Sequence, residues 1–84
     1  MLSVSTPALE QLHSSLLSSN DTSKCFRIVP KDEATLTLKY MEFEDSDTTF
    51  DMKGRTVLAL PEVLAPYCQD KSLDVGNDGG LELA

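Results

Sequence analysis

Residues 35–43 read TLTLKYMEF, and this stretch decides the fold class. Side chains alternate between the two faces of a strand, so Leu36, Leu38 and Tyr40 share one face of an extended chain. From Met41 onward the apolar residues fall on the opposite face, which predicts either a β-bulge near Tyr40 or burial of both faces. The stretch therefore predicts a β-strand and requires partner strands around it.

Short apolar runs on both sides supply those partners. Upstream, residues 25–29 predict a strand whose length Pro30 limits, because proline cannot donate to the ladder. Downstream, residues 48–52 and 55–60 predict a hairpin around a tight turn at Lys53 and Gly54. Shorter strands are expected at residues 2–4, 73–75 and 81–83, the last two joined by a glycine-rich turn.

Two segments carry helix signals. A hydroxyl residue before Pro7 is typical of a helix start, and leucines at helical spacing continue the pattern to Ser18. Pro61 predicts the start of a second, short helix that Pro66 limits. Together the elements predict one domain over residues 1–84 of the α+β class, mainly β, with one N-terminal amphipathic helix and one short helix.

The charge of the chain argues against two classes of partner. The formal net charge is -7, and the seven Lys and Arg residues are scattered along the sequence. Binding to nucleic acid or to an anionic membrane depends on clustered positive charge, so neither partner is expected. The N-terminus lacks the basic start and apolar run of a signal peptide, which predicts a cytoplasmic protein with reduced thiols.

The residues that carry most chemistry are few. Cys25 and Cys68 are the only cysteines, lie far apart in sequence and form no CxxC motif, so small buried thiols are expected. A structural zinc or cluster site takes about four ligands, which two cysteines supply only across a homodimer. His13 is the sole histidine, and no nucleophile or carboxylate is spaced to pair with it. We therefore predict no enzyme, no cofactor and no metal site.

An acidic patch follows the central strand. It fails the calcium-loop pattern, since counting from its first aspartate places Phe50 where glycine is needed and Thr56 where glutamate is needed. We interpret it as a solvated edge that discourages aggregation between strands. Its members are Glu42, Glu44, Asp45, Asp47 and Asp51.

One apolar cluster is a candidate partner surface. Pro61, Pro66 and Tyr67 lie in or beside the short helix, and tyrosine is enriched at protein interfaces. Packing of the short helix onto the sheet accounts for the same residues, so both interpretations stay open. The glycine-rich turn near Gly79 is a hairpin turn, because it lacks a lysine and a following helix to hold phosphate.

The order of elements resembles the HesB-like family of A-type iron-sulfur carrier proteins over nearly the whole chain. Residues 40–43, YMEF, look like the aromatic-apolar-Glu-Phe strand of that family, and residues 51–54, DMKG, precede a valine-rich strand as they do there. Residues 73–75, LDV, follow a short helix in the same way. The resemblance implies a small HesB-like β-sandwich or barrel-like fold and a relation to iron-sulfur cluster assembly.

The same resemblance implies that the ligands of the cluster are missing. In the family, a glycine-flanked cysteine lies in the turn before the long strand, whereas residues 30–35 here contain neither cysteine nor glycine. The family's Cys-x-Cys lies in a tail that would begin at Ala84. We expect a noncatalytic interaction or accessory module that binds another protein. The alternative is an iron-sulfur or metal-binding protein that uses Cys25 and Cys68 across a homodimer, and a small enzyme ranks last.

Overall fold

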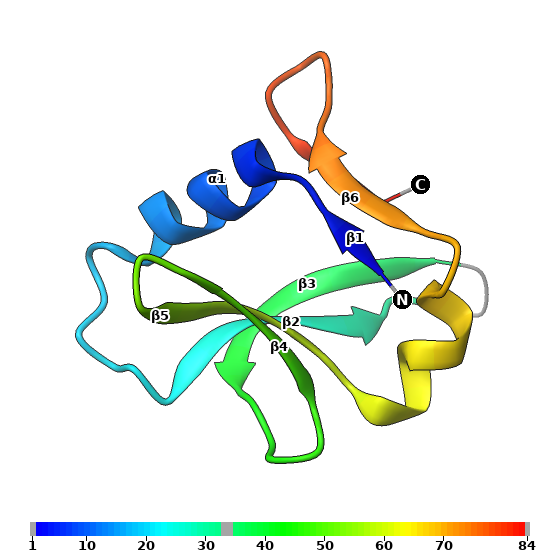
Figure 1. Cartoon of the computed structure of the whole chain (residues 1–84), viewed down its shortest axis with the longest axis horizontal. Helices are drawn as coiled ribbons and strands as arrows, with labels where there is room; N and C mark the ends of the chain where they lie inside the picture. The colour runs from blue at the N-terminus through cyan, green and yellow to red at the C-terminus, as the bar shows by residue number, and fades with distance from the viewer. Residues whose placement is uncertain (1, 33–34, 84) are drawn as a thin grey trace.

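Seven strands and two helices follow one another along the chain in the computed structural model, which describes residues 2–32 and 35–83 (Figure 1). They are β1 (Ser3–Val4), α1 (Thr6–Leu16), β2 (Lys24–Pro30), β3 (Leu36–Glu42), β4 (Thr48–Met52), β5 (Arg55–Leu60), the 3₁₀-helix η1 (Glu62–Cys68), β6 (Ser72–Val75) and β7 (Leu81–Leu83). The predicted α+β class, mainly β, with an N-terminal helix and one short helix, is confirmed.

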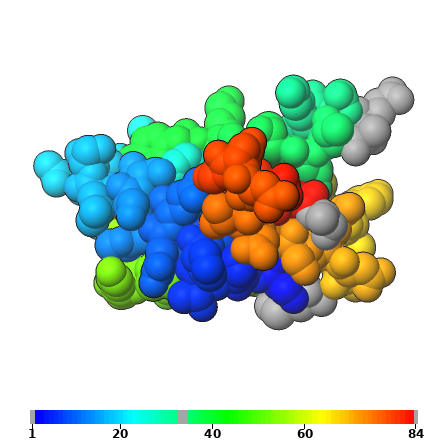
Figure 2. All heavy atoms as spheres, turned by 90° about the horizontal axis from the view of Figure 1, so that it is seen from above, coloured from blue at the N-terminus to red at the C-terminus, as the bar shows by residue number. Residues whose placement is uncertain are grey.

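The strands form two mixed sheets. One has four strands in the order β3-β2-β5-β4, with β2 and β5 parallel and the other two pairs antiparallel. The other has three strands in the order β1-β6-β7, with β1 parallel to β6 and β7 antiparallel to it. Figure 2 shows the β6–β7 hairpin, orange to red, between α1 in blue and β3 in green.

α1 packs its apolar side into the core. Ser5 caps the helix, because its hydroxyl oxygen accepts a hydrogen bond from the Ala8 N–H at 3.2 Å. Ala8, Leu12 and Leu16 recur at helical spacing and are all buried. The helix ends at Leu16, two residues before the predicted end. No helix within residues 2–32 and 35–83 is long and apolar enough to cross a membrane.

Arg55 of β5 fixes the chain just after α1. Its guanidinium donates hydrogen bonds to the carbonyl oxygens of Leu16 at 2.8 Å, Ser19 at 3.1 Å and Asp21 at 3.3 Å. Carbonyls at the end of a helix lack partners within the helix, and here the Leu16 oxygen accepts from both Arg55 and the Ser19 N–H, the latter at 3.0 Å. A residue 39 positions away in sequence thus adds to the local hydrogen bonds that hold the end of α1.

The predicted β-bulge near Tyr40 is wrong. β2 and β3 pair in regular register from Lys24 opposite Glu42 to Pro30 opposite Leu36, and the irregularity lies in β4 between Phe50 and Asp51. The alternative prediction, burial of both faces, does not hold for β3 either, because Thr37, Lys39, Tyr40 and Glu42 are exposed. The physical reason is position in the sheet: β5 lies between β2 and β4, and its residues Val57–Leu60 are all buried, whereas β3 is an edge strand. Regular pairing with β2 places Met41, half-buried, on the face opposite to Leu36 and Leu38 without a bulge.

The β4–β5 hairpin closes through the predicted tight turn. Lys53 has a φ of 53° and Gly54 a φ of 78°, and two successive positive values are typical of the turns that match the twist of a hairpin. Glycine adopts this conformation without steric cost. The turn places Arg55 at the start of β5, from where it reaches the end of α1.

Candidate protein-interaction surfaces

The two cysteines lie in separate parts of the molecule. Cys25 is at the start of β2 opposite Met41, and Cys68 is the last residue of η1. In Figure 1, β2 begins (cyan) at the opposite end of the molecule from η1 (yellow). Both side chains are 0% exposed. The structure does not bring the two thiols together.

Burial also keeps both thiols protonated. Desolvation, followed by the nearby Asp47 carboxylate, raises the pKa of Cys25 to about 11. Desolvation likewise raises the pKa of Cys68. Because the thiolate is the nucleophile and the metal ligand, neither cysteine is prepared for those roles at neutral pH. Across residues 2–32 and 35–83, no three His, Cys, Asp or Glu side chains cluster so that they could hold a metal ion.

The acidic patch contains a structural ion pair. The Asp47 carboxylate is buried and accepts hydrogen bonds from Arg27 Nε at 2.8 Å and Arg27 Nη2 at 3.0 Å, and from the Glu44 N–H at 3.1 Å. The bonds from Arg27 hold the pKa of Asp47 below its ordinary value. The interpretation of the whole patch as a solvated edge is therefore wrong for Asp47. Sequence reasoning missed Arg27 because its partner is 20 residues away.

The predicted partner surface around the short helix loses Pro61 and gains Val63. Pro61 is buried at the start of η1, so it supports the helix from the core side. Pro66 is exposed, and Tyr67 and Val63 are 73% and 77% exposed. Residues three apart align along a 3₁₀-helix, which places Val63 and Pro66 on one side. We call Val63, Pro66 and Tyr67 the η1 surface; the three-residue spacing is the signal that would have found Val63.

A groove continues the η1 surface toward the four-stranded sheet. It has a volume of about 480 Å³ and lies between η1 and the adjoining ends of β2 and β3. Leu36 and Leu64 supply apolar walls, and Tyr67 belongs to both the groove and the η1 surface. Lys71 and Asp32 add one charge of each sign to the same lining. Tyr67 is thus an exposed aromatic side chain beside an apolar hollow, an arrangement typical of protein interfaces.

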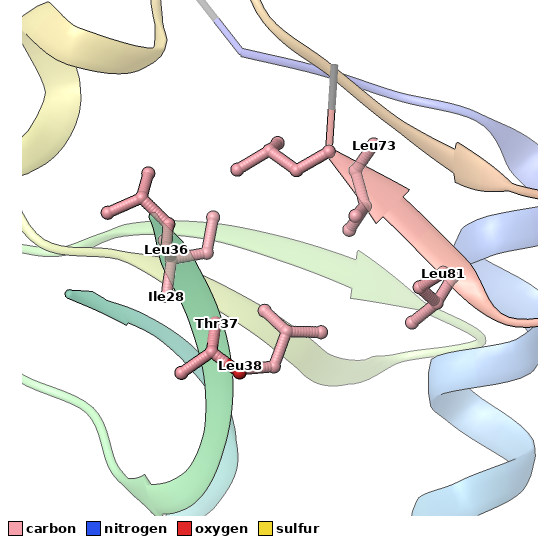
Figure 3. Close-up of a pocket in the computed structure, with 7 residues that line it drawn as sticks. Ile28, Leu36, Thr37, Leu38, Leu73 and Leu81 are labelled. Atoms are coloured by element: carbon pink, nitrogen blue, oxygen red, sulfur yellow. The ribbon is translucent and has the colours of Figure 1, made fainter. Parts of the chain in front are cut away.

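A second hollow lies between the two sheets (Figure 3). It has a volume of about 250 Å³, and leucine side chains from β3, β6 and β7 point into it. We call it the intersheet cavity. Its lining consists of Ile28, Leu36, Thr37, Leu38, Leu73, Leu81 and Leu83. The alternation of leucines predicted the strands, but not that β3 and β7 approach the same space.

No protein-family model and no curated protein matches this chain. The resemblance to the HesB-like family therefore stays a prediction from the residues that carry it.

Proposed function

We propose that this protein is a noncatalytic interaction module of the HesB-like type. In this proposal it is cytoplasmic and accessory to iron-sulfur cluster assembly, and it binds another protein without holding a cluster of its own. The observation that carries the proposal is the η1 surface. Among the described residues, Val63 and Tyr67 are the two most exposed large apolar side chains. The relation to cluster assembly comes from the element order and from residues 40–43 and 51–54.

The chemistry of the η1 surface favours a protein partner. On a free protein, large apolar side chains seldom lie exposed next to one another. A contiguous patch of them marks a site that an interaction partner covers. Tyrosine is enriched among the residues that carry most of the binding energy at interfaces. The groove beside Tyr67 adds concave apolar area within reach of the same partner.

The noncatalytic part of the proposal is supported by the state of the thiols. Cys25 and Cys68 are fully buried with raised pKa values, so neither offers a thiolate to a substrate or a metal. The homodimer alternative requires both cysteines at one subunit interface. No observation favours it, because the two side chains are 0% exposed and lie in separate elements. Metal and acid-labile sulfide content of protein purified without oxygen tests it, since stoichiometric iron with sulfide would overturn our proposal.

The proposed function is tested with scaffold and carrier proteins of iron-sulfur cluster assembly as titrants. Calorimetry measures their Kd for the wild-type chain, for a Val63→Ser/Tyr67→Ser double variant, and for Leu17→Ser as the matched control. Leu17 is 66% exposed on the segment after α1, so its loss removes exposed apolar area from another surface. Loss of a central aromatic side chain costs about 2 kcal/mol or more, which is roughly thirtyfold in Kd.

Three outcomes decide between these possibilities. Binding that survives Leu17→Ser and weakens at least thirtyfold in the double variant supports the proposal. Absence of binding to every assembly protein contradicts the accessory role. Equal weakening in both variants contradicts the assignment to the η1 surface. Circular dichroism of each variant establishes that it is folded before the comparison is made.

A further inference from the structure

The intersheet cavity is bordered by the free edges of both sheets. Among the strands of the described residues, β3 is an edge strand of the sheet β3-β2-β5-β4, and β7 is an edge strand of the sheet β1-β6-β7. Each contributes two leucines to the cavity, Leu36 and Leu38 from β3, and Leu81 and Leu83 from β7. Figure 3 shows the side chains of the two strands facing one another across the hollow.

The backbone of β7 presents its peptide groups at the open edge. The Leu73 carbonyl oxygen accepts a hydrogen bond from the Ser5 N–H at 3.0 Å, so the peptide groups of Leu73 face β1. Peptide groups of successive residues in a strand point to opposite sides, so those of Asp74 face β7. Asp74 pairs with Glu82, so the peptide groups of Glu82 face β6. The N–H and C=O groups of the flanking residues, Leu81 and Leu83, consequently point away from the sheet.

Leu81 and Leu83 thus do two things at once. Their side chains line the cavity, and their peptide groups lie at an edge where a further strand can pair. Addition of a strand to such an edge gives affinity through main-chain hydrogen bonds and specificity through pockets for alternate side chains. A dry cavity of about 150 Å³ holds a benzene molecule. The volume of about 250 Å³ here leaves room for apolar side chains from an added strand.

Charge on the other face of the hairpin defines the partner further. Glu82 and Asp74 are cross-strand neighbours with exposed side chains. Neither carboxylate forms an ion pair within the part of the chain that the structure describes. A residue placed beside Glu82 on an added strand would lie next to that carboxylate, which favours lysine or arginine. Asp74 adds negative charge one strand further away, where its Oδ1 accepts hydrogen bonds from the Ser5 hydroxyl and the Val75 N–H. A second copy is disfavoured, because pairing Leu81 with Leu83 of another β7 sets Glu82 against Glu82, and each chain has a net charge of -7.

We propose that a partner protein adds an extended segment of the pattern apolar-basic-apolar to the free edge of β7. The two apolar side chains enter the intersheet cavity against Leu36 and Leu38, and the basic side chain lies beside Glu82. The inference rests on the proposed function, since it requires a protein partner, and it adds a surface separate from the η1 surface and the chemistry of the segment that binds there.

The probe is a synthetic peptide of alternating valine and lysine, with a valine-glutamate peptide and a serine-lysine peptide as controls. Amide hydrogen exchange of the full, isotope-labelled chain is followed by NMR during titration. We expect the Leu81 and Leu83 amides to exchange at least tenfold more slowly with the valine-lysine peptide. The Glu82 amide already bonds to β6, so its exchange should change least of the three. Neither control peptide should protect the edge to this extent.

A charge reversal tests the basic position. Glu82→Lys changes an exposed side chain. It should weaken binding of the valine-lysine peptide at least tenfold and strengthen binding of the valine-glutamate peptide. Asp45→Lys makes the same change in net charge in the exposed loop before β4, and it should leave the preference unchanged. A shift of equal size in both variants would mean that net charge alone attracts the peptide, and would overturn the inference.

The outcomes separate this inference from the proposed function. No protection of Leu81 and Leu83 at millimolar peptide overturns the added strand, whatever the assembly proteins do. Binding that perturbs only Val63 and Tyr67 also overturns it, while leaving the η1 surface as the site of the proposed function. Protection of the β7 edge without binding to any assembly protein supports the added strand and rejects the accessory role.

Discussion

Substitution Asp47→Ala removes the centre of the buried ion pair. Its carboxylate accepts two hydrogen bonds from Arg27 and one from the Glu44 N–H. The Asp47 side chain is 0% exposed and that of Arg27 is 15% exposed. After the substitution, the ion-pair partner left to the guanidinium among the described residues is Glu44 at 3.6 Å, whose side chain is 70% exposed. The variant therefore leaves a mostly buried positive charge without its strongest partner.

The cost follows from this burial. Removing one member of a fully buried ion pair costs about 3–5 kcal/mol, and partial exposure of Arg27 places the value near 3 kcal/mol. A domain of 84 residues has a free energy of unfolding of roughly 4–13 kcal/mol. The variant should thus lose a large share of its stability. For a domain of this size, about 3 kcal/mol corresponds to a fall in Tm of roughly 12–24 °C.

Urea unfolding at pH 7, followed by circular dichroism, measures the loss. The matched control is Asp45→Ala, an exposed carboxylate in the same loop, which should change the free energy of unfolding by less than about 0.5 kcal/mol. Arg27→Ala and the double variant complete a cycle that isolates the pair. Equal losses for Asp47→Ala and Asp45→Ala would refute the reasoning, as would additive losses for Arg27→Ala and Asp47→Ala.

The pH dependence gives an independent check with a definite sign. Arg27 lowers the pKa of Asp47 in the folded state, so the unfolded state binds the proton more readily. The contribution is fully present above the unfolded pKa, about 3.9, and is lost as the pH falls through the lower folded pKa. The stability gap between wild type and Asp47→Ala should therefore narrow below about pH 4. A gap that stays constant down to pH 2 would contradict this assignment.

Three further predictions concern stability and thiol reactivity. Arg55→Met removes three hydrogen bonds to carbonyl oxygens after α1 and should lower the free energy of unfolding by about 2–3 kcal/mol in urea, whereas the exposed Lys39→Met should leave it nearly unchanged. Gly54→Ala forces a residue with a Cβ to a φ of 78° and should cost about 1–2 kcal/mol, so an unaltered thermal unfolding curve would be inconsistent with the turn. An aromatic disulfide reagent at pH 8 should label neither cysteine in the native protein and both in denaturant, because Cys25 and Cys68 are buried with raised pKa values. The stability that comes from keeping the Cys25 thiol neutral is present below the pKa of the unfolded state. It is lost as the pH rises toward about 11, the pKa of Cys25 in the folded state.

Local patterns predicted the elements well because their causes are local. The hairpin around Gly54 follows from turn chemistry that two residues carry, and α1 begins where Ser5 caps it and Pro7 fits its first turn. The bulge predicted near Tyr40 was wrong because β2 and β3 pair in regular register across that residue. Whether both faces are covered depends on how the whole sheet is packed, which no window of the sequence contains.

The candidate site was predicted in part for the same reason. Pro66 and Tyr67 are exposed as expected of a partner surface, whereas Pro61 is buried and Val63 was missed. A proline that starts a helix is compatible with a buried or an exposed position. The choice depends on which side of η1 packs against the sheet.

The sequence by itself determined where the strands and helices lie, the acidic charge, and the small set of residues available for chemistry. Only the tertiary structure decided that Arg27 meets Asp47, that Cys25 and Cys68 are buried in separate elements, and that the edges of β3 and β7 border one cavity. Alternation, caps and turns act between neighbouring residues, so the sequence displays them directly. Strand pairing and side-chain burial are set by the apolar area that the whole chain removes from water, and that quantity exists only in the folded molecule.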